Sequence, residues 1–118
     1  MPIAIKRAYE AASSKDGYRV LVDGLWPRGV TKAQLEIDAW MKEIAPSAAL
    51  RKWYGHKPEK WEEFRNKYRQ ELSKPPRKAL LDELVERARK DQLTLVFGAR
   101  DPERSNAAVL AEMIRAKL

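Results

Sequence analysis

Two short polar loops carry most of the residues that could do chemistry in this sequence. The first loop, DGLWPRG, contains Asp23, Trp26 and Arg28, and the second, GARDP, contains Asp101. A carboxylate can transfer a proton, an arginine fork can bind an anion, and an indole ring can stack on a ligand. These residue types predict a site for an anion such as a phosphate or a carboxylate.

His56 is the single histidine and therefore the one ordinary side chain that titrates near neutral pH. It lies just beyond a predicted helix end, where its protonated form is favoured. As a general base it would serve catalysis together with Asp23; as a surface residue at the helix end it would serve structure, and the sequence favours neither role. One histidine and no cysteine exclude a His-rich or thiolate metal site, and no motif supports a carboxylate-held Mg²⁺ ion. We therefore predict no metal site, and the cofactor is left unknown.

The other candidate residues also have a structural interpretation. Aspartates such as Asp23 and Asp101 commonly close turns, and the sequence gives that role and a binding role equal weight. Trp26 would either stack on a ligand ring or fix its loop to the core, and the second role is favoured. Trp53 lies close to His56 in the sequence, so it would suit the wall of a pocket.

The elements that must position these residues are predicted from hydrophobic patterning. Strands are expected at residues 3–6, 18–23 and 93–97. Helices are expected at residues 32–35, 48–54, from 58 to the break at Pro75–Pro76, 77–90 and 106–117. Residues 36–44 fit both the helical and the strand period, and a short edge strand is favoured.

Helices between the early and the late strands favour parallel strand pairing. We expect an α/β fold, with a small, mostly parallel sheet of three or four strands flanked by about four helices, as a single domain over residues 1–118. Ligands of open parallel sheets bind beyond the carboxyl ends of the strands. Asp23 and Asp101 should therefore lie at the same end of the sheet. The last helix should begin near Asn106 and direct its free N–H groups to that end.

The charge balance favours anionic partners without identifying one. The 118 residues include 24 Lys and Arg against 17 Asp and Glu, for a net charge of +7. Many of these charges form i, i+4 pairs such as Glu63 with Lys67, so a solvated basic surface is favoured over a dedicated nucleic-acid interface. The absence of cysteine and of long apolar runs predicts a cytoplasmic protein that does not enter a membrane. The oligomeric state is not predicted.

Longer stretches of the sequence resemble a known family. RVLVDGLWPRG at residues 19–29 and APSAALRKWYGH at residues 45–56 are similar to the hallmark pattern of the YeaO-like proteins of bacteria and archaea. WEEFRNKYRQEL at residues 61–72 is similar as well, and the resemblance covers essentially the whole chain. The family is a domain of unknown function, so the resemblance implies no particular activity.

Two classes of function fit these observations. The leading hypothesis is a small enzyme or ligand-binding domain for an anionic, nucleotide-like metabolite, in which Asp23 and His56 perform acid–base chemistry. Arg28 would hold the anion and Trp26 would stack on a ring, so the side chains of Asp23, Arg28 and His56 should converge in one pocket. The further predicted ligand contacts are Trp53, Asp101 and Asn106. The alternative is a basic nucleic-acid-binding or partner-binding module without catalysis, and the sequence does not decide whether the chain is an enzyme.

Overall fold

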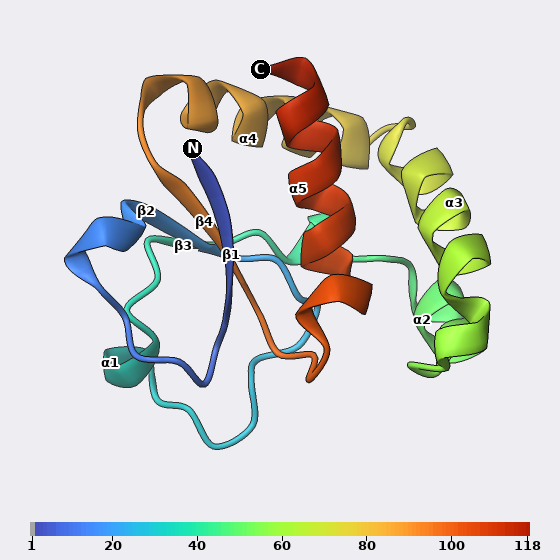
Figure 1. The fold of residues 1–118 in the computed structure, drawn as a ribbon, viewed down its shortest axis with the longest axis horizontal. Coiled ribbons are helices and arrows are strands. Elements are labelled where there is room, and N and C mark those ends of the chain that lie inside the picture. The colour runs from blue at the N-terminus through green and yellow to red at the C-terminus, as the bar shows by residue number, and fades with distance from the viewer. Residues whose placement is uncertain (1) are drawn as a thin grey trace.

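The computed structural model describes residues 2–118 and shows an α/β architecture (Figure 1). The strands are β1 (Ile3–Arg7), β2 (Tyr18–Leu21), β3 (Ala39–Trp40) and β4 (Leu93–Phe97). The helices are α1 (Lys32–Leu35), α2 (Ala48–Tyr54), α3 (Trp61–Leu72), α4 (Arg77–Lys90) and α5 (Asn106–Lys117). All strand pairs are parallel, in the order β1-β4-β2-β3, which confirms the predicted fold class.

Strand β4 lies at the centre of the hydrophobic core. It pairs with β1 on one side and with β2 on the other, so that Leu95 lies between Ile5 and Val20. Every residue of β4 is buried, which explains its almost continuously apolar sequence. Its one polar residue, Thr94, donates a hydrogen bond of 2.7 Å to the backbone oxygen of Asp16.

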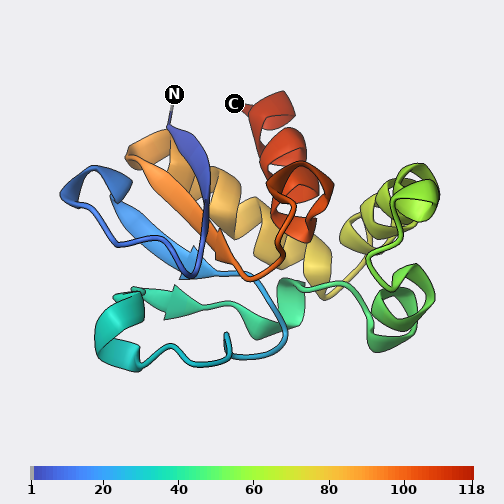
Figure 2. The same cartoon turned by 60° about the horizontal axis from the view of Figure 1, so that its bottom comes forward.

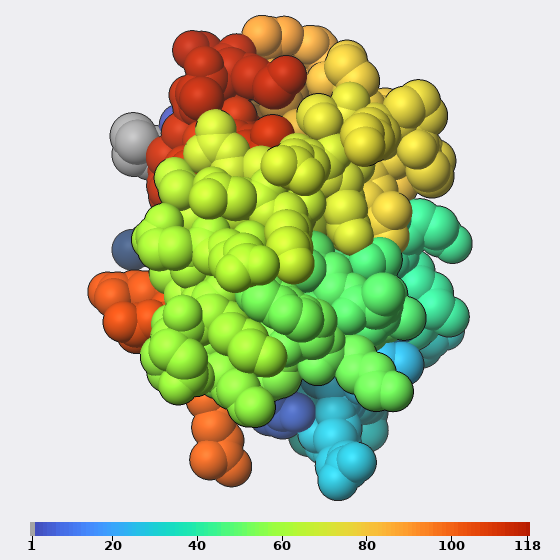
Figure 3. Space-filling view, turned by 90° about the vertical axis from the view of Figure 1, so that its right-hand side faces the viewer, coloured from blue at the N-terminus to red at the C-terminus, as the bar shows by residue number. Residues whose placement is uncertain are grey.

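The two faces of the sheet are covered differently (Figure 2). The face that carries Val20, Leu95 and Phe97 belongs to the main core, together with buried residues of α4 and α5. The opposite face carries Leu21 and Val96 and is covered by a smaller cluster from α1 and its flanking loops. Helix α3 packs outside α4 and α5, and α2 packs on α3, so that α2 and α3 form one side of the molecule (Figure 3).

The predicted edge strand within residues 36–44 is confirmed, but it is only two residues long. Asp38 N–H and Met41 N–H donate to the backbone oxygens of Arg19 and Leu21, which attaches β3 to β2. Glu36 precedes the strand in the left-handed region at φ 48°, and a 3-10 helix follows it at Lys42–Ile44. These two turns leave room for little more than one pair of strand residues.

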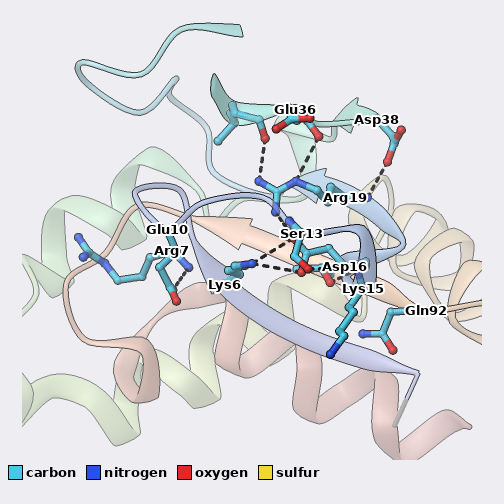
Figure 4. A network of polar contacts seen from close by, with 12 residues as sticks. Lys6, Arg7, Glu10, Ser13, Lys15, Asp16, Arg19, Glu36, Asp38 and Gln92 are labelled. Carbon is cyan, nitrogen blue, oxygen red and sulfur yellow. Dashed lines mark hydrogen bonds and ion pairs between the residues drawn. The ribbon is translucent and has the colours of Figure 1, made fainter. Parts of the chain in front are cut away.

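A network of charged residues holds the second face of the sheet together (Figure 4). Arg19 of β2 is only 4% exposed, and it donates to a carboxylate oxygen of Asp16 at 2.7 Å. The same guanidinium donates to the backbone oxygens of Leu35 and Glu36 at 2.7 and 3.1 Å. Lys6 of β1 lies 3.2 Å from the Asp16 carboxylate. The network therefore ties β1, β2 and the end of α1 to one buried carboxylate, a feature that sequence patterning did not predict.

The start of β1 and the end of α5 lie at the same end of the sheet (Figure 1). Because the strands are parallel and α5 follows β4, α5 runs back towards the end of the sheet at which the strands start (Figures 1 and 2). The loops that follow β2 and β4 lie at the opposite end, where the strands finish. Within residues 2–118, no helix has the length and apolar character needed to cross a membrane.

Candidate functional site

A pocket of about 280 Å³ opens at the carboxyl ends of β2 and β4, the edge of a parallel sheet at which ligands bind. Its apolar lining comes from Leu25, Ala45, Pro46, Tyr54, Phe64 and Ala99. Its polar lining comes from Asp23, Arg51, His56, Arg104, Ser105 and Asn106. A mostly apolar wall with a few polar groups is typical of small-molecule sites.

Asp23 joins the ends of the two central strands. It lies just beyond β2, and its Oδ2 accepts a hydrogen bond of 2.8 Å from the backbone N–H of Gly98, just beyond β4. A Cβ atom on residue 98 would lie 3.3 Å from that oxygen, a close approach that favours glycine here. Asp23 also lines the pocket, where the Asn106 side chain lies near its carboxylate.

Burial and polar contacts act in opposite directions on the pKa of Asp23. Burial raises its pKa above the ordinary value, and the Gly98 N–H and the Asn106 side chain oppose this only in part. The positive charges of Arg51 and His56 lower the pKa further but do not cancel the effect of burial. The carboxylate therefore retains a proton at higher pH than a free aspartate does.

Arg51 of α2 brings a positive charge to the pocket. A Cβ atom on Gly24 would lie 3.1 Å from its Nη1, so the guanidinium lies close against the loop after β2. Among residues 2–118 its side chain has no hydrogen-bond or ion-pair partner. Arg104, by contrast, already pairs with Asp101 at 2.9 Å. Arg51 is thus the cation of this pocket that is most available to a ligand.

His56 reaches the pocket through an unusual backbone turn. Gly55 and His56 both adopt the left-handed region, at φ 54° and 57°, where α2 ends. Histidine enters this region less easily than glycine does. The imidazole centre lies 5.8 Å from the ring centre of Tyr54, and both residues line the pocket.

Asn106 places the first turn of α5 at the pocket. Its Nδ2 donates 3.1 Å to the backbone oxygen of Val22, which fixes the start of the helix to the end of β2. Ser105 caps the helix, because its Oγ accepts a hydrogen bond from Ala108 N–H at 3.2 Å. The positive end of the helix dipole therefore faces the pocket.

The predicted site residues fall into separate groups. Asp23, His56 and Asn106 line the same pocket. Asp101 lies at an adjoining hollow of about 500 Å³, which shares His56 and Arg104 with the first pocket.

Trp26 and Arg28 lie away from the pocket. Trp26 donates through Nε1 to Val30 O at 2.6 Å and packs into the smaller core cluster, so it fixes its loop. Because that loop turns to cover the second face of the sheet, it carries Arg28 to an exposed position outside the pocket. The expected convergence of Asp23, Arg28 and His56 is therefore not observed, and Arg51 provides the cation beside Asp23.

Trp53 lies in a different groove, between α2 and α3. Lys67 Nζ and Lys60 Nζ lie 4.1 and 4.8 Å from the centre of its ring, in cation–π geometry. The groove is lined by Trp53, Lys67 and other residues of the two helices, and it shares no residue with the pocket at Asp23. Residues 2–118 contain no group of three His, Asp or Glu side chains placed to hold a metal ion.

Fold and pocket together define a small parallel α/β protein with a mostly apolar pocket in which a carboxylate and two arginines lie at the strand ends. Residues 2–118 match the family described as the "Inactive DUF488-N3 subclade", and the chain belongs to this family.

The relatives confirm the family resemblance found in the sequence. The uncharacterized protein YeaO of Escherichia coli (strain K12) is 41% identical over 115 residues, which cover 98% of each chain. Uncharacterized proteins of Mycobacterium tuberculosis (strain H37Rv) and Mycobacterium bovis are each 39% identical over 115 residues, covering 98% of this chain and 95% of the relative. No solved structure matches the chain significantly.

Proposed function

We propose that this protein binds a small metabolite carrying a carboxylate or phosphate group in the pocket at the ends of β2 and β4. The observation that carries the proposal is Arg51, a pocket-lining guanidinium without a partner among residues 2–118. A guanidinium binds a planar carboxylate or a phosphate through two parallel hydrogen bonds.

Two other features support an anionic ligand. The start of α5 adds the positive end of a helix dipole, and His56 adds an imidazole that can donate a hydrogen bond. The apolar wall, which includes Tyr54 and Phe64, would bury the remainder of the ligand.

We favour binding without catalysis. The description of the family as an inactive subclade supports this choice. In this proposal Asp23 and His56 hold the ligand instead of performing the acid–base chemistry expected from the sequence.

The nucleic-acid-binding alternative has less support. Cations on the outer helices are paired with carboxylates: Lys67 with Glu63, Lys78 with Asp82. Such interleaved charges are typical of a solvated surface, whereas a phosphate-binding face concentrates unpaired cations.

The test compares two arginine variants by thermal shift and calorimetry against a panel of small acids and phosphates. A ligand of the wild-type protein should raise the melting temperature, because it binds only the folded state. Arg51→Ala should weaken its binding by roughly ten- to a hundredfold, the effect of losing a charge-assisted hydrogen bond.

Arg28→Ala is the matched control, because it removes the same charge from an exposed position outside the pocket. It should leave the affinity nearly unchanged. Equal losses in the two variants would show that the binding depends on net charge alone, and would overturn the proposal.

A further inference from the structure

The pocket holds two opposite charges that do not neutralise each other. Asp23 and Arg51 both line it, yet they form no ion pair. One oxygen of Asp23 accepts a hydrogen bond from Gly98 N–H, and the Asn106 side chain also lies near the carboxylate. A carboxylate offers about four acceptor positions, so these contacts leave part of its hydrogen-bonding capacity for a ligand.

A ligand whose only polar group is an anion would fit this arrangement poorly. Its charge would bind Arg51 but would also lie near the carboxylate of Asp23, and like charges repel strongly where the solvent is partly excluded. A ligand with a hydrogen-bond donor beside its anionic group would satisfy both residues at once.

We propose that the ligand is a 2-amino or 2-hydroxy acid, whose carboxylate binds Arg51 and whose ammonium or hydroxyl group donates to the carboxylate of Asp23. This inference rests on the proposed function and names the ligand class of the same pocket. The two groups of such an acid lie on neighbouring carbon atoms, so one small ligand carries both into the pocket that Asp23 and Arg51 line.

The wall of the pocket indicates an apolar side chain on that acid. Phe64 and Tyr54 line the interior, and Leu25 lines the rim with 71% of its surface exposed. Together these side chains offer apolar surface to a ligand. An aliphatic or aromatic group on the ligand would bury part of it.

Calorimetry with three acids of one carbon skeleton tests the inference: leucine, 2-hydroxy-4-methylpentanoate and 4-methylpentanoate. The two acids with a donor should bind the wild-type protein about tenfold or more tightly than the plain acid, because each adds a hydrogen bond to a carboxylate. In Asp23→Asn this preference should shrink, with the largest loss for leucine. The asparagine oxygen can still accept from Gly98 N–H, so the strand ends should remain joined.

The possible results separate this inference from the proposed function. If the plain acid binds as tightly as leucine and Arg51→Ala abolishes both, the role of Asp23 is overturned and the anion pocket stands. The same conclusion follows if none of the three acids binds but other acids or phosphates of the panel do. If no member of the panel binds, both proposals fail.

Discussion

His56 holds a backbone conformation that a glycine would adopt more easily. Its φ of 57° lies in the left-handed region, which costs a residue with a Cβ atom roughly 1 kcal/mol. We expect His56→Gly to increase the free energy of unfolding by up to about 1 kcal/mol and to weaken ligand binding, since the imidazole lines the pocket. Urea denaturation and calorimetry measure the two effects.

Glu36 provides a control for this prediction. It is the other non-glycine residue with positive φ in residues 2–118, at 48°, and it is exposed at the end of α1, outside the pocket. Glu36→Gly should stabilise the fold to a similar extent and leave the affinity unchanged. If His56→Gly stabilises the protein without any loss of affinity, His56 is not a ligand contact.

At the scale of single residues, part of the candidate site could be predicted from the sequence. Asp23 and Asn106 could be placed because a strand end and a helix start determine where they lie. Arg51 could not be distinguished from its neighbour Lys52, because only the packing of α2 directs one of the two side chains towards Gly24. The loop after β2 makes Arg28 a candidate in the sequence, but the burial of Trp26 carries that loop to the other face.

At the scale of elements, Arg7 connects β1 to the loop after β4, which lines the pocket. Its Nε donates 2.8 Å to Ala99 O, and its Nη2 lies 3.5 Å from Gly98 O. Arg7→Lys should reduce the free energy of unfolding by about 1 kcal/mol, since a lysine cannot span both carbonyl groups. It should also weaken ligand binding severalfold although Arg7 does not line the pocket, because Gly98 positions Asp23.

Arg89→Lys is the matched control for Arg7→Lys. Arg89 of α4 also donates to a backbone oxygen, that of Lys117, at 2.9 Å, and it lies away from the pocket. Its replacement should affect stability and leave the affinity intact. Parallel calorimetric titrations of both variants make the comparison, and an unchanged affinity in Arg7→Lys would exclude a positioning role.

Most elements could be predicted from hydrophobic period and capping residues, because both are local properties of the chain. The order of the strands could not, since it depends on which crossovers pack best. The pattern does not predict the Asp16–Arg19 network for a related reason: a buried arginine contradicts the usual pattern of a strand, and its partner Asp16 lies outside the strands, in a 3-10 helix before β2.

For the whole molecule, this network should control stability at low pH. Burial alone would raise the pKa of Asp16, but hydrogen bonds from Ser13 N–H, Lys6 and Arg19 hold it below its ordinary value of 3.8. The stabilisation by Asp16 is therefore fully present above pH 3.8 and is lost as the pH falls through the lower pKa of the folded protein. Asp16→Asn should reduce the free energy of unfolding by roughly 3 kcal/mol at pH 7, and by less in acid.

Denaturant titrations between pH 7 and acid conditions test this expectation. Asp82→Asn is the control, because Asp82 pairs with Lys78 on the exposed surface of α4 and such pairs contribute little. A difference between the wild-type protein and Asp16→Asn that stays constant with pH would contradict the assignment. Asp23 has the opposite effect on the pH dependence, because its pKa is raised in the folded protein. Its contribution to stability is present at low pH and is lost as the pH rises through its pKa in the folded protein.

The positions of the start of β1 and the end of α5 also determine how the protein can be attached to other molecules. Strand β1 starts and α5 ends at one end of the sheet, and the loops after β2 and β4 lie at the other end (Figures 1 and 2). A fluorescent reporter or a surface tether attached just before β1 or just after α5 would therefore lie away from the pocket. The protein could be immobilised at either of these positions as the recognition layer of a sensor, with the pocket still open to the solution.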